Sequence, residues 1–163
     1  MTIRETVDAY LEDSRKAIIA NMARDGMNAS GSFSKSLRPE TKEQGLNITG
    51  ILYGAPHSYF VDHGRGKTTT SQSGAKPLRL IIRKWIDDKG ITPNDKISKD
   101  SLAFLIARKI HREGWKPKNK YPNGIISSVI NEVSINKLSK EIGKISAHNL
   151  ASEIFNGFTD SAR

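Results

Sequence analysis

Apolar residues recur at helical spacing along the first two dozen positions of the chain. The positions are Ile3, Val7, Leu11, Ile18 and Met22. Residues at this spacing share one face of an α-helix. Thr2 and Glu5 have the spacing of a capping box, in which each side chain bonds the backbone of the other. The pattern predicts a helix from about Ile3 to Arg24, with Gly26 as its stop.

A β pattern follows this helix. Residues 32–42 alternate loosely, with Phe33 and Leu37 on one face, and residues 46–53 are β-branched and aromatic. We expect an antiparallel strand pair. Pro39 cannot donate to a sheet ladder, so it should confine its strand to an edge or mark a bulge.

A short aromatic segment comes next. Proline is tolerated at a first helical position, so Ala55-Pro56 can open a helical turn. We expect Tyr59, Phe60 and Val61 to pack onto the strands. Residues 67–76 have the Thr, Ser, Gly and Lys composition of an exposed loop.

Two amphipathic helices are predicted between Pro77 and Gly114. The first begins at Pro77 and closes at Gly90, and Ser98 caps the second, which ends at Gly114. The apolar stripe of the first consists of Leu78, Ile81, Ile82, Trp85 and Ile86. The residues expected to face inward on the second are Leu102, Leu105, Ile106 and Ile110.

The last third of the chain predicts an extended arm and more helix. Residues 115–123 hold two prolines and three lysines and read as extended, and residues 124–133 and 134–158 read as two helices that could run on as one. The fold class is therefore α+β, with a small antiparallel sheet packed by the long N-terminal helix and several helices in the C-terminal half. We expect one domain over residues 1–163, with an α+β core to residue 66, the exposed loop, and a helical part from residue 77.

Length and composition exclude several classes of protein. At 163 residues the chain can bury a core without disulfides or metals, and its lack of cysteine excludes thiolate zinc sites and thiol nucleophiles. No apolar run approaches the ~20 residues of a membrane span. The N-terminal segment carries acidic residues where a signal peptide would be apolar. We expect the chain to be made and used in cytoplasm, without a membrane partner.

The positive charge of the chain is concentrated in one segment. The net charge is +9, and residues 65–120 hold fifteen Lys or Arg against five Asp or Glu. Such segregation indicates an acidic partner, either nucleic acid phosphate or an acidic protein face. The basic residues predicted to face this partner are Arg65, Lys67, Arg79, Arg83, Lys84, Arg108, Lys109, Arg112 and Lys116.

The basic stretch over residues 108–121 is compatible with either partner, nucleic acid or protein. Trp115 and Tyr121 could stack on the bases of a single strand while the lysines and arginines follow the phosphates. Alternatively, Trp115 fastens the segment to its own domain or to a neighbouring subunit. A protein contact is the interpretation we favour.

Candidate catalytic and metal-binding groups have weak support. A metal site is conceivable around His57, Asp62 and His63, which could lie near Asp8, Glu12 and Asp13, but the spacing matches no ligand signature. Residues 64–69 resemble the end of a phosphate-binding loop, yet the first glycine of that motif would fall on Val61. Asp87 and Asp88 are adjacent on a helix and point apart. We expect a protein without enzymatic activity and without a cofactor.

Residues 30–66 carry a resemblance to a known family. Residues 30–37 read Ser-Gly-Ser-Phe-Ser-Lys-Ser-Leu, a second strand follows, and residues 55–64 read Ala-Pro-His-Ser-Tyr-Phe-Val-Asp-His-Gly. This order resembles the bacteriophage tail-completion or head-tail joining proteins, in which a small-Gly-x-hydrophobic-x-x-Ser-hydrophobic opening leads to an Ala-x-x-Tyr-aromatic-Val-acid-x-Gly turn. The resemblance covers residues 1–66. The family's Pro-rich C-terminal strand is replaced here by helices.

The resemblance implies a structural virion protein of the neck or tail region, assembled in the bacterial cytoplasm. Many copies would form a closed ring through head-to-tail contacts between the portal and the tail, near packaged DNA. Which layer the chain occupies, ring adaptor, stopper or tail terminator, stays open. The residues predicted to contact sister subunits are Gly31, Phe33, Tyr53, Tyr59 and Trp115.

The resulting hypothesis assigns the two surfaces different partners. The basic segment would dock on an acidic face of the portal or the next tail ring, while residues 31–33 and 46–53 would contact sister subunits. Charge reversal at Arg79, Arg83 and Lys84 should then prevent attachment without unfolding the subunit. The alternative is a basic DNA-binding or assembly-accessory protein, with a metal-dependent nuclease third.

Overall fold

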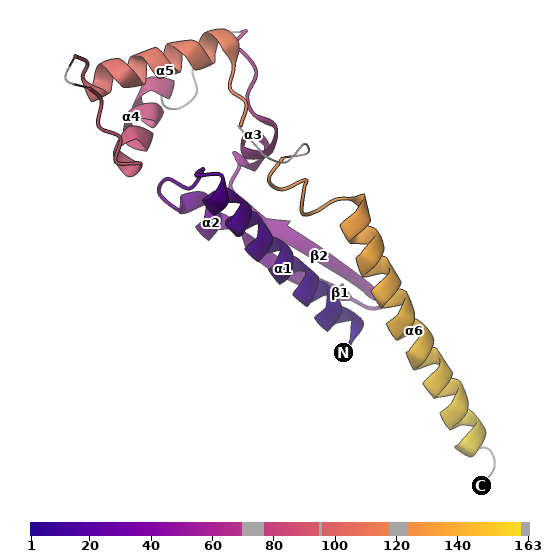
Figure 1. Cartoon of the computed structure of the whole chain (residues 1–163). Helices are drawn as coiled ribbons and strands as arrows, with labels where there is room; N and C mark the ends of the chain where they lie inside the picture. The colour runs from indigo at the N-terminus through magenta and orange to yellow at the C-terminus, as the bar shows by residue number, and fades with distance from the viewer. Residues whose placement is uncertain (70–76, 95, 118–123, 161–163) are drawn as a thin grey trace.

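The computed structural model describes residues 1–69, 77–94, 96–117 and 124–160, with side chains described through residue 158 (Figure 1). Within these residues the chain forms six helices and a two-stranded antiparallel sheet, so the predicted α+β class is confirmed. Much of the expected loop over residues 67–76 and of the expected arm over residues 115–123, including Tyr121, lies outside the described residues.

Helix α1 spans Ile3–Arg24, as predicted. The Thr2 hydroxyl accepts a hydrogen bond from the Glu5 N–H at 3.1 Å, and the Glu5 carboxylate accepts one from the Thr2 N–H at 2.7 Å. The capping box therefore supplies partners for two N–H groups that a helix start leaves unbonded.

The strand pair is shorter than predicted at its beginning. Strand β1 covers Arg38–Gln44 and pairs with β2, Asn47–Tyr53, in a register that places Pro39 opposite Leu52. The prediction of a strand over residues 32–36 is wrong, because Ser32–Ser36 forms the short helix α2. Phe33 and Leu37 are four residues apart, a spacing that also places them on one face of a helix.

Helix α3 spans Ser58–His63, after the turn that Ala55-Pro56 opens. Val61 is partly buried and packs against the core cluster, whose buried members lie outside the strands. Tyr59 and Phe60 are exposed and do not pack onto the strands. Their rings instead contact each other edge to face at 5.9 Å, and Tyr59 stacks on His63 at 4.6 Å.

Helices α4 (Leu78–Asp88) and α5 (Lys99–Glu113) pack mainly on each other. Their boundaries agree with the predictions at Pro77, Ser98 and Gly114. Fully or nearly buried apolar residues at this contact are Ile86, Ala103 and Ala107. Leu105, predicted to face inward, is about half exposed, because the small side chains of the two alanines form the contact face instead.

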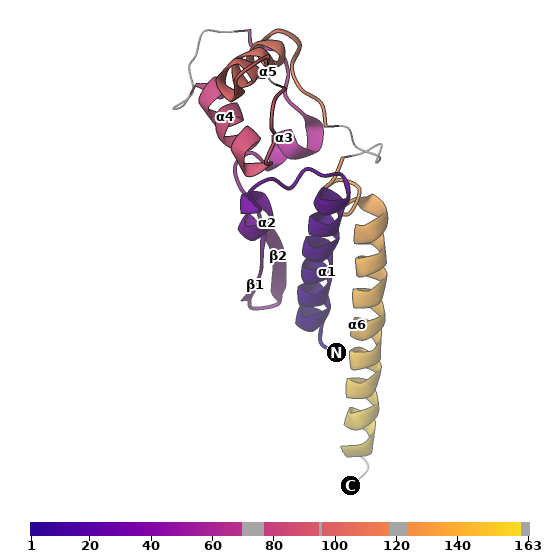
Figure 2. The same cartoon turned by 60° about the vertical axis from the view of Figure 1, so that its left-hand side comes forward.

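Helix α6 spans Glu132–Asp160. Residues 125–130 form successive turns, so the prediction of a helix over residues 124–133 is wrong. Figure 2 shows that α1 lies between the hairpin and α6, with contacts to both. In Figures 1 and 2, α6 runs past the N-terminus of α1. The Tyr10 and Ser134 hydroxyls, 2.9 Å apart, join the two helices.

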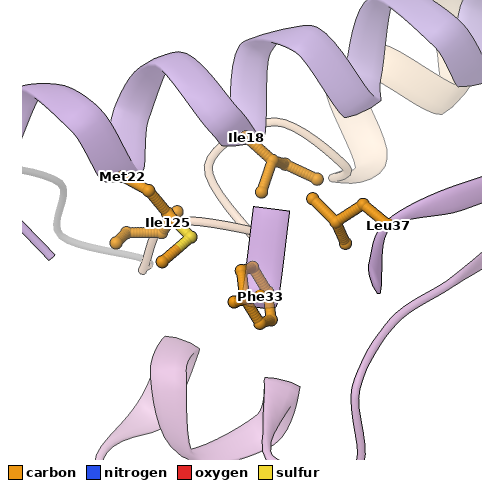
Figure 3. Close-up of a cluster of buried hydrophobic side chains, with 5 residues drawn as sticks. All are labelled: Ile18, Met22, Phe33, Leu37 and Ile125. Carbon is orange, nitrogen blue, oxygen red and sulfur yellow. The ribbon is translucent and has the colours of Figure 1, made fainter. Parts of the chain in front are cut away.

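The main core lies where α1, α2 and the 124–130 turns meet. Figure 3 shows its five buried side chains, Ile18, Met22, Phe33, Leu37 and Ile125. We call α1, α2, the hairpin, α3 and residues 124–130 the body. We call the described residues from 65 to 115, which contain α4 and α5, the arm.

Candidate functional site

The two halves of the sequence motif meet in the body. Ser36, at the end of α2, accepts a hydrogen bond from the Ala55 N–H at 3.0 Å and donates one to the Phe33 carbonyl at 2.7 Å. The rings of Phe33 and His57 lie 5.7 Å apart. Residues 31–37 and 55–64 therefore form one junction around the first turn of α3.

Asp62 is the most heavily bonded side chain of this junction. Its carboxylate, almost completely buried, accepts hydrogen bonds from the Ile126 N–H at 2.6 Å, from the Ser127 N–H at 3.3 Å, and from the Ser127 hydroxyl. Hydrogen bonds to an ionised carboxylate are stronger than those between neutral groups. We call this set of contacts the Asp62 clasp, because it holds the turns that lead into α6 against α3.

The conceivable metal site around His57, Asp62 and His63 finds no support in this geometry. No group of three or more His, Asp or Glu that could hold a metal occurs among the residues the structure describes. The Asp62 oxygens already bond N–H and hydroxyl groups, and His57 instead contacts Phe33. Asp62 therefore organises the backbone here.

The base of the arm is a crossing of two chain segments. Arg65 and Trp115 pair as an antiparallel bridge, with N–H to carbonyl distances of 2.6 and 2.7 Å. Gly64 and Gly114 flank the bridge with φ of +82° and +79°, and a Cβ at either would come within 3.0 Å of a carbonyl oxygen of the other segment. Glycine is needed at both positions for the left-handed backbone and for the close approach.

Further polar contacts continue the crossing into α5. The Thr68 N–H donates to the His111 carbonyl at 2.9 Å, and the Thr68 hydroxyl lies 2.7 Å from the His111 ring. The Arg65 guanidinium donates to the same hydroxyl at 3.0 Å. Arg65 therefore contributes to the arm's attachment.

Four of the basic residues predicted to meet an acidic partner have partners within the subunit: Arg65 in the Thr68 contact and three in ion pairs. Arg83 bridges Asp87 and, at 3.4 Å, Asp100, which joins α4 to α5. Lys84 pairs with Asp88 at 2.8 Å, and Arg112 pairs with Glu113. Charge reversal at Arg83 would disturb the α4–α5 contact, so this residue is unsuited to the attachment test.

The other five basic residues are exposed. They are Lys67, Arg79, Arg108, Lys109 and Lys116. None of them has an ion-pair partner within 4.0 Å among the described residues. These side chains keep their positive charge available at the arm surface.

Asp87 links two basic groups of the arm electrostatically, Lys99 and Arg83. The Lys99 ammonium donates to it at 2.8 Å, and this bond, with that of Arg83, lowers the pKa of the Asp87 carboxyl. Burial acts in the opposite direction and is outweighed. The carboxylate therefore stays ionised and holds the arm's internal cations.

The predicted subunit contacts differ in their exposure. Phe33 belongs to the core at 5% exposure, so its side chain is not presented to a neighbour. Tyr53 and Trp115 are partly exposed, and Tyr59 is exposed. Tyr53 lies under the Arg38 guanidinium, 5.0 Å from its ring centre.

An apolar surface on α6 was not among the predicted contact residues. The exposed side chains are Leu150, Ile154, Phe155 and Phe158, with exposures between 52% and 73%. The signal for it lies in the helical phase of these residues, which differs from that of Leu138 and Ile142 nearer the start of the helix.

Comparisons with known proteins give no further assignment. No family model matches the chain, and neither a curated protein nor a solved structure matches it. Among the described residues, none of the helices combines the length and the apolar character needed to cross a membrane.

Proposed function

We propose that this chain is a structural virion protein of a tailed bacteriophage, forming part of a ring in the connector between portal and tail and mediating head-tail joining or tail completion. The basic arm would dock on an acidic face of the portal or an adjacent tail protein. Sister copies would complete the ring.

The motif junction is the observation that carries this proposal. Residues 31–37 and 55–64 resemble tail-completion proteins, and their side chains build a scaffold: Phe33 and Leu37 fill the core, and Asp62 holds the turns that lead into α6. A motif whose residues have structural roles is expected of an assembly subunit.

The distribution of exposed surface supports the same function. The arm carries free positive charge at Arg79 and Arg108, and the end of α6 carries exposed apolar side chains. Contiguous exposed apolar surface marks protein contacts more often than free surface. A subunit with a charged face and an apolar face suits a layered assembly.

Quantitative mass spectrometry of purified, nuclease-treated phage particles tests the proposal. The expected result is a low copy number relative to the portal, as for a ring. Absence of the chain from intact particles would contradict it and would favour an assembly-accessory protein.

A charge-reversal variant tests the docking face within the same system. Arg79→Glu/Arg108→Glu/Lys116→Glu should yield heads and tails that do not join, because all three residues are exposed and have no internal ion pair among the described residues. The matched control is Lys137→Glu/Lys140→Glu/Lys144→Glu, which changes the same charge on the exposed part of α6. Normal joining by the arm variant would contradict this docking face.

DNA binding is the second candidate, because Arg108 and Lys109 lie side by side and exposed on α5. A DNA-binding protein would lose affinity steeply with salt as counterions are released. Titrating the purified chain with duplex and single-stranded DNA at several salt concentrations separates the two functions. Tight, salt-dependent binding that the arm variant abolishes would favour DNA as the partner.

A further inference from the structure

The C-terminal half of α6 projects from the body. Residues 146–158 are all exposed, and in both Figures 1 and 2 this half lies beside none of the other described helices or strands. Its length is about 20 Å at 1.5 Å per residue. Isolated helices shorter than about 12–15 residues are marginal in water, so a partner that covers this half would stabilise it.

The apolar residues of the projecting half form a sharply defined stripe. They are Ala147, Leu150, Ala151, Ile154, Phe155 and Phe158. At 100° per residue they occupy an arc of about 140°, and polar residues together with Gly157 fill the remainder. We call these six residues the C-terminal stripe.

The C-terminal stripe faces away from the side of α6 that packs on the body. The partly buried residues near the start of the helix are Leu138, Ile142 and Ile145. Their mean direction differs from that of the stripe by about 180° around the helix axis. The stripe is therefore a second apolar face, and extending the α1–α6 contact would not cover it.

A groove of matching character lies at the other end of the molecule. It has a volume of about 490 Å³ and lies between α4 and the segment joining α1 to α2. Its apolar lining includes Met22, Met27, Val61, Ile81, Trp85 and Trp115. Grooves of this size and lining accept the apolar face of an amphipathic helix.

Charge and position point to a second copy of the chain as the partner. Glu153 is the one charged residue of the sequence from 146 to 158, so the projecting half carries a net negative charge. The groove is bordered by the Lys84–Asp88 ion pair and by Lys89, so its border keeps a net positive charge. Figures 1 and 2 place the projecting half and the arm at opposite ends of the molecule, so they cannot meet within one copy.

We propose that the C-terminal stripe of one copy docks in the α4 groove of a second copy. Each copy then offers one stripe and one groove, which makes the contact head-to-tail and able to propagate from copy to copy. This contact deepens the ring part of the proposed function and identifies the surfaces that would form it.

Sedimentation velocity of the purified full chain over a range of concentrations tests the contact. The stripe variant is Phe155→Asp/Phe158→Asp, and the groove variant is Ile81→Asp; all three positions are at least half exposed, so the fold should survive. Matched controls are Asn149→Asp/Ser152→Asp, on the polar face of the same half, and Leu80→Asp, equally exposed but outside the groove lining. Far-ultraviolet circular dichroism checks the fold of each variant.

The wild-type chain and both controls should form species larger than dimers as concentration rises. Each of the two variants alone should associate at least about tenfold more weakly, as expected when central apolar anchors are lost. An equimolar mixture of the two variants should form a 1:1 complex and nothing larger, because one intact stripe and one intact groove remain between them.

Two results would overturn the contact. A wild-type chain that stays monomeric at every concentration shows that copies do not associate through these surfaces. A groove variant that associates like the wild type shows that the stripe pairs elsewhere, for example with a second stripe. Particle composition is measured independently: a chain that assembles as mapped but is absent from particles refutes the proposed function alone, and the reverse outcome refutes this contact alone.

Discussion

The body and the arm differ in how each holds its helices. The body encloses a cluster of five buried apolar side chains that includes Ile18 and Phe33. The arm buries Ile86 and two alanines, and leaves Leu80, Ile81 and Phe104 about half exposed. Polar contacts compensate in the arm, through the Arg65–Trp115 bridge and the ion pairs around Asp87.

This difference suggests that the body supplies most of the stability of the fold, while the arm presents surface to a partner. Burial of apolar surface is the main favourable contribution to folding, so the body has the larger source of stability. Regions with few buried apolar contacts open at lower free energy than the core. The arm therefore depends more on its base and its ion pairs, and its apolar surface remains available to a partner.

Truncation of one isoleucine in each region should give the largest effects and should test whether the body and the arm unfold separately. Ile18→Ala should lower the free energy of unfolding by about 3–4 kcal/mol, through lost burial and a residual cavity. Ile86→Ala should mainly speed amide hydrogen exchange in α4 and α5, since α4 packs mainly on α5. Urea denaturation with exchange on both variants measures this. If Ile86→Ala shifts the exchange of α1 as much as that of α4, the two regions are one cooperative unit.

Loss of the Asp62 clasp should destabilise the body next most. Asp62→Ala leaves the Ile126 and Ser127 N–H groups without their acceptor, which should cost about 2–3 kcal/mol by urea denaturation. The control Asp13→Ala, at an exposed position on α1, should stay within about 0.5 kcal/mol of the wild type. Equal effects of the two substitutions would contradict a structural role for the clasp.

A methyl group at the arm's base should affect the arm alone. Gly114→Ala forces a left-handed residue and a clash with the Arg65 carbonyl, at a cost of about 1–3 kcal/mol. Hydrogen exchange should rise in α4 and α5 and stay unchanged in α1. Gly66→Ala is the matched control, since a Cβ there meets nothing within 4 Å. A uniform rise across the chain after Gly114→Ala would contradict the separation of arm and body.

Acidification should produce the smallest effect, confined to the arm. Since the pKa of Asp87 is lowered in the folded chain, its bonds to Lys99 and Arg83 stabilise the arm above the ordinary pKa of about 4. That contribution is lost as the pH falls through the lowered value. Exchange in α4 and α5, compared between pH 5 and pH 3, should rise more in the wild type than in Asp87→Asn. An identical rise in both would contradict this role.

Local signals predicted the elements that begin and end at caps. The Thr2 capping box, Pro77, Ser98 and Gly114 all mark boundaries that the structure contains. Each of these signals acts within a few residues, so the sequence displays it directly. The α+β class followed from the same local patterns.

Contacts between distant residues explain why two predicted elements were wrong. Residues 124–133 have helical periodicity, but Asp62, more than sixty positions away, bonds the backbone N–H groups of Ile126 and Ser127. Residues 32–36 fit both a helix and a strand face, and packing of Phe33 into the core accompanies the helix. Local propensity gives way to tertiary contacts at such positions.

Only part of the candidate site could be predicted, because contacts between distant residues also decide which charged side chains are free. Net charge located the basic segment, yet only the structure reveals that Arg83 is engaged by Asp87 and Asp100. The C-terminal stripe could have been found from residue phase, because Leu150 and Ile154 lie about 120° around the helix axis from Leu138 and Ile142. The exposure of Leu150 and Ile154 could not be read from the sequence, because it depends on α6 running past the N-terminus of α1.

Hydrogen–deuterium exchange on the purified chain at low and high concentration tests most directly whether the body folds by itself while the end of α6 is completed by a neighbour. The account predicts slow exchange in α1 and the hairpin at both concentrations, and exchange in residues 146–158 that is fast when dilute and protected when concentrated. Protection of residues 146–158 in the dilute monomer, or no change with concentration, would contradict it.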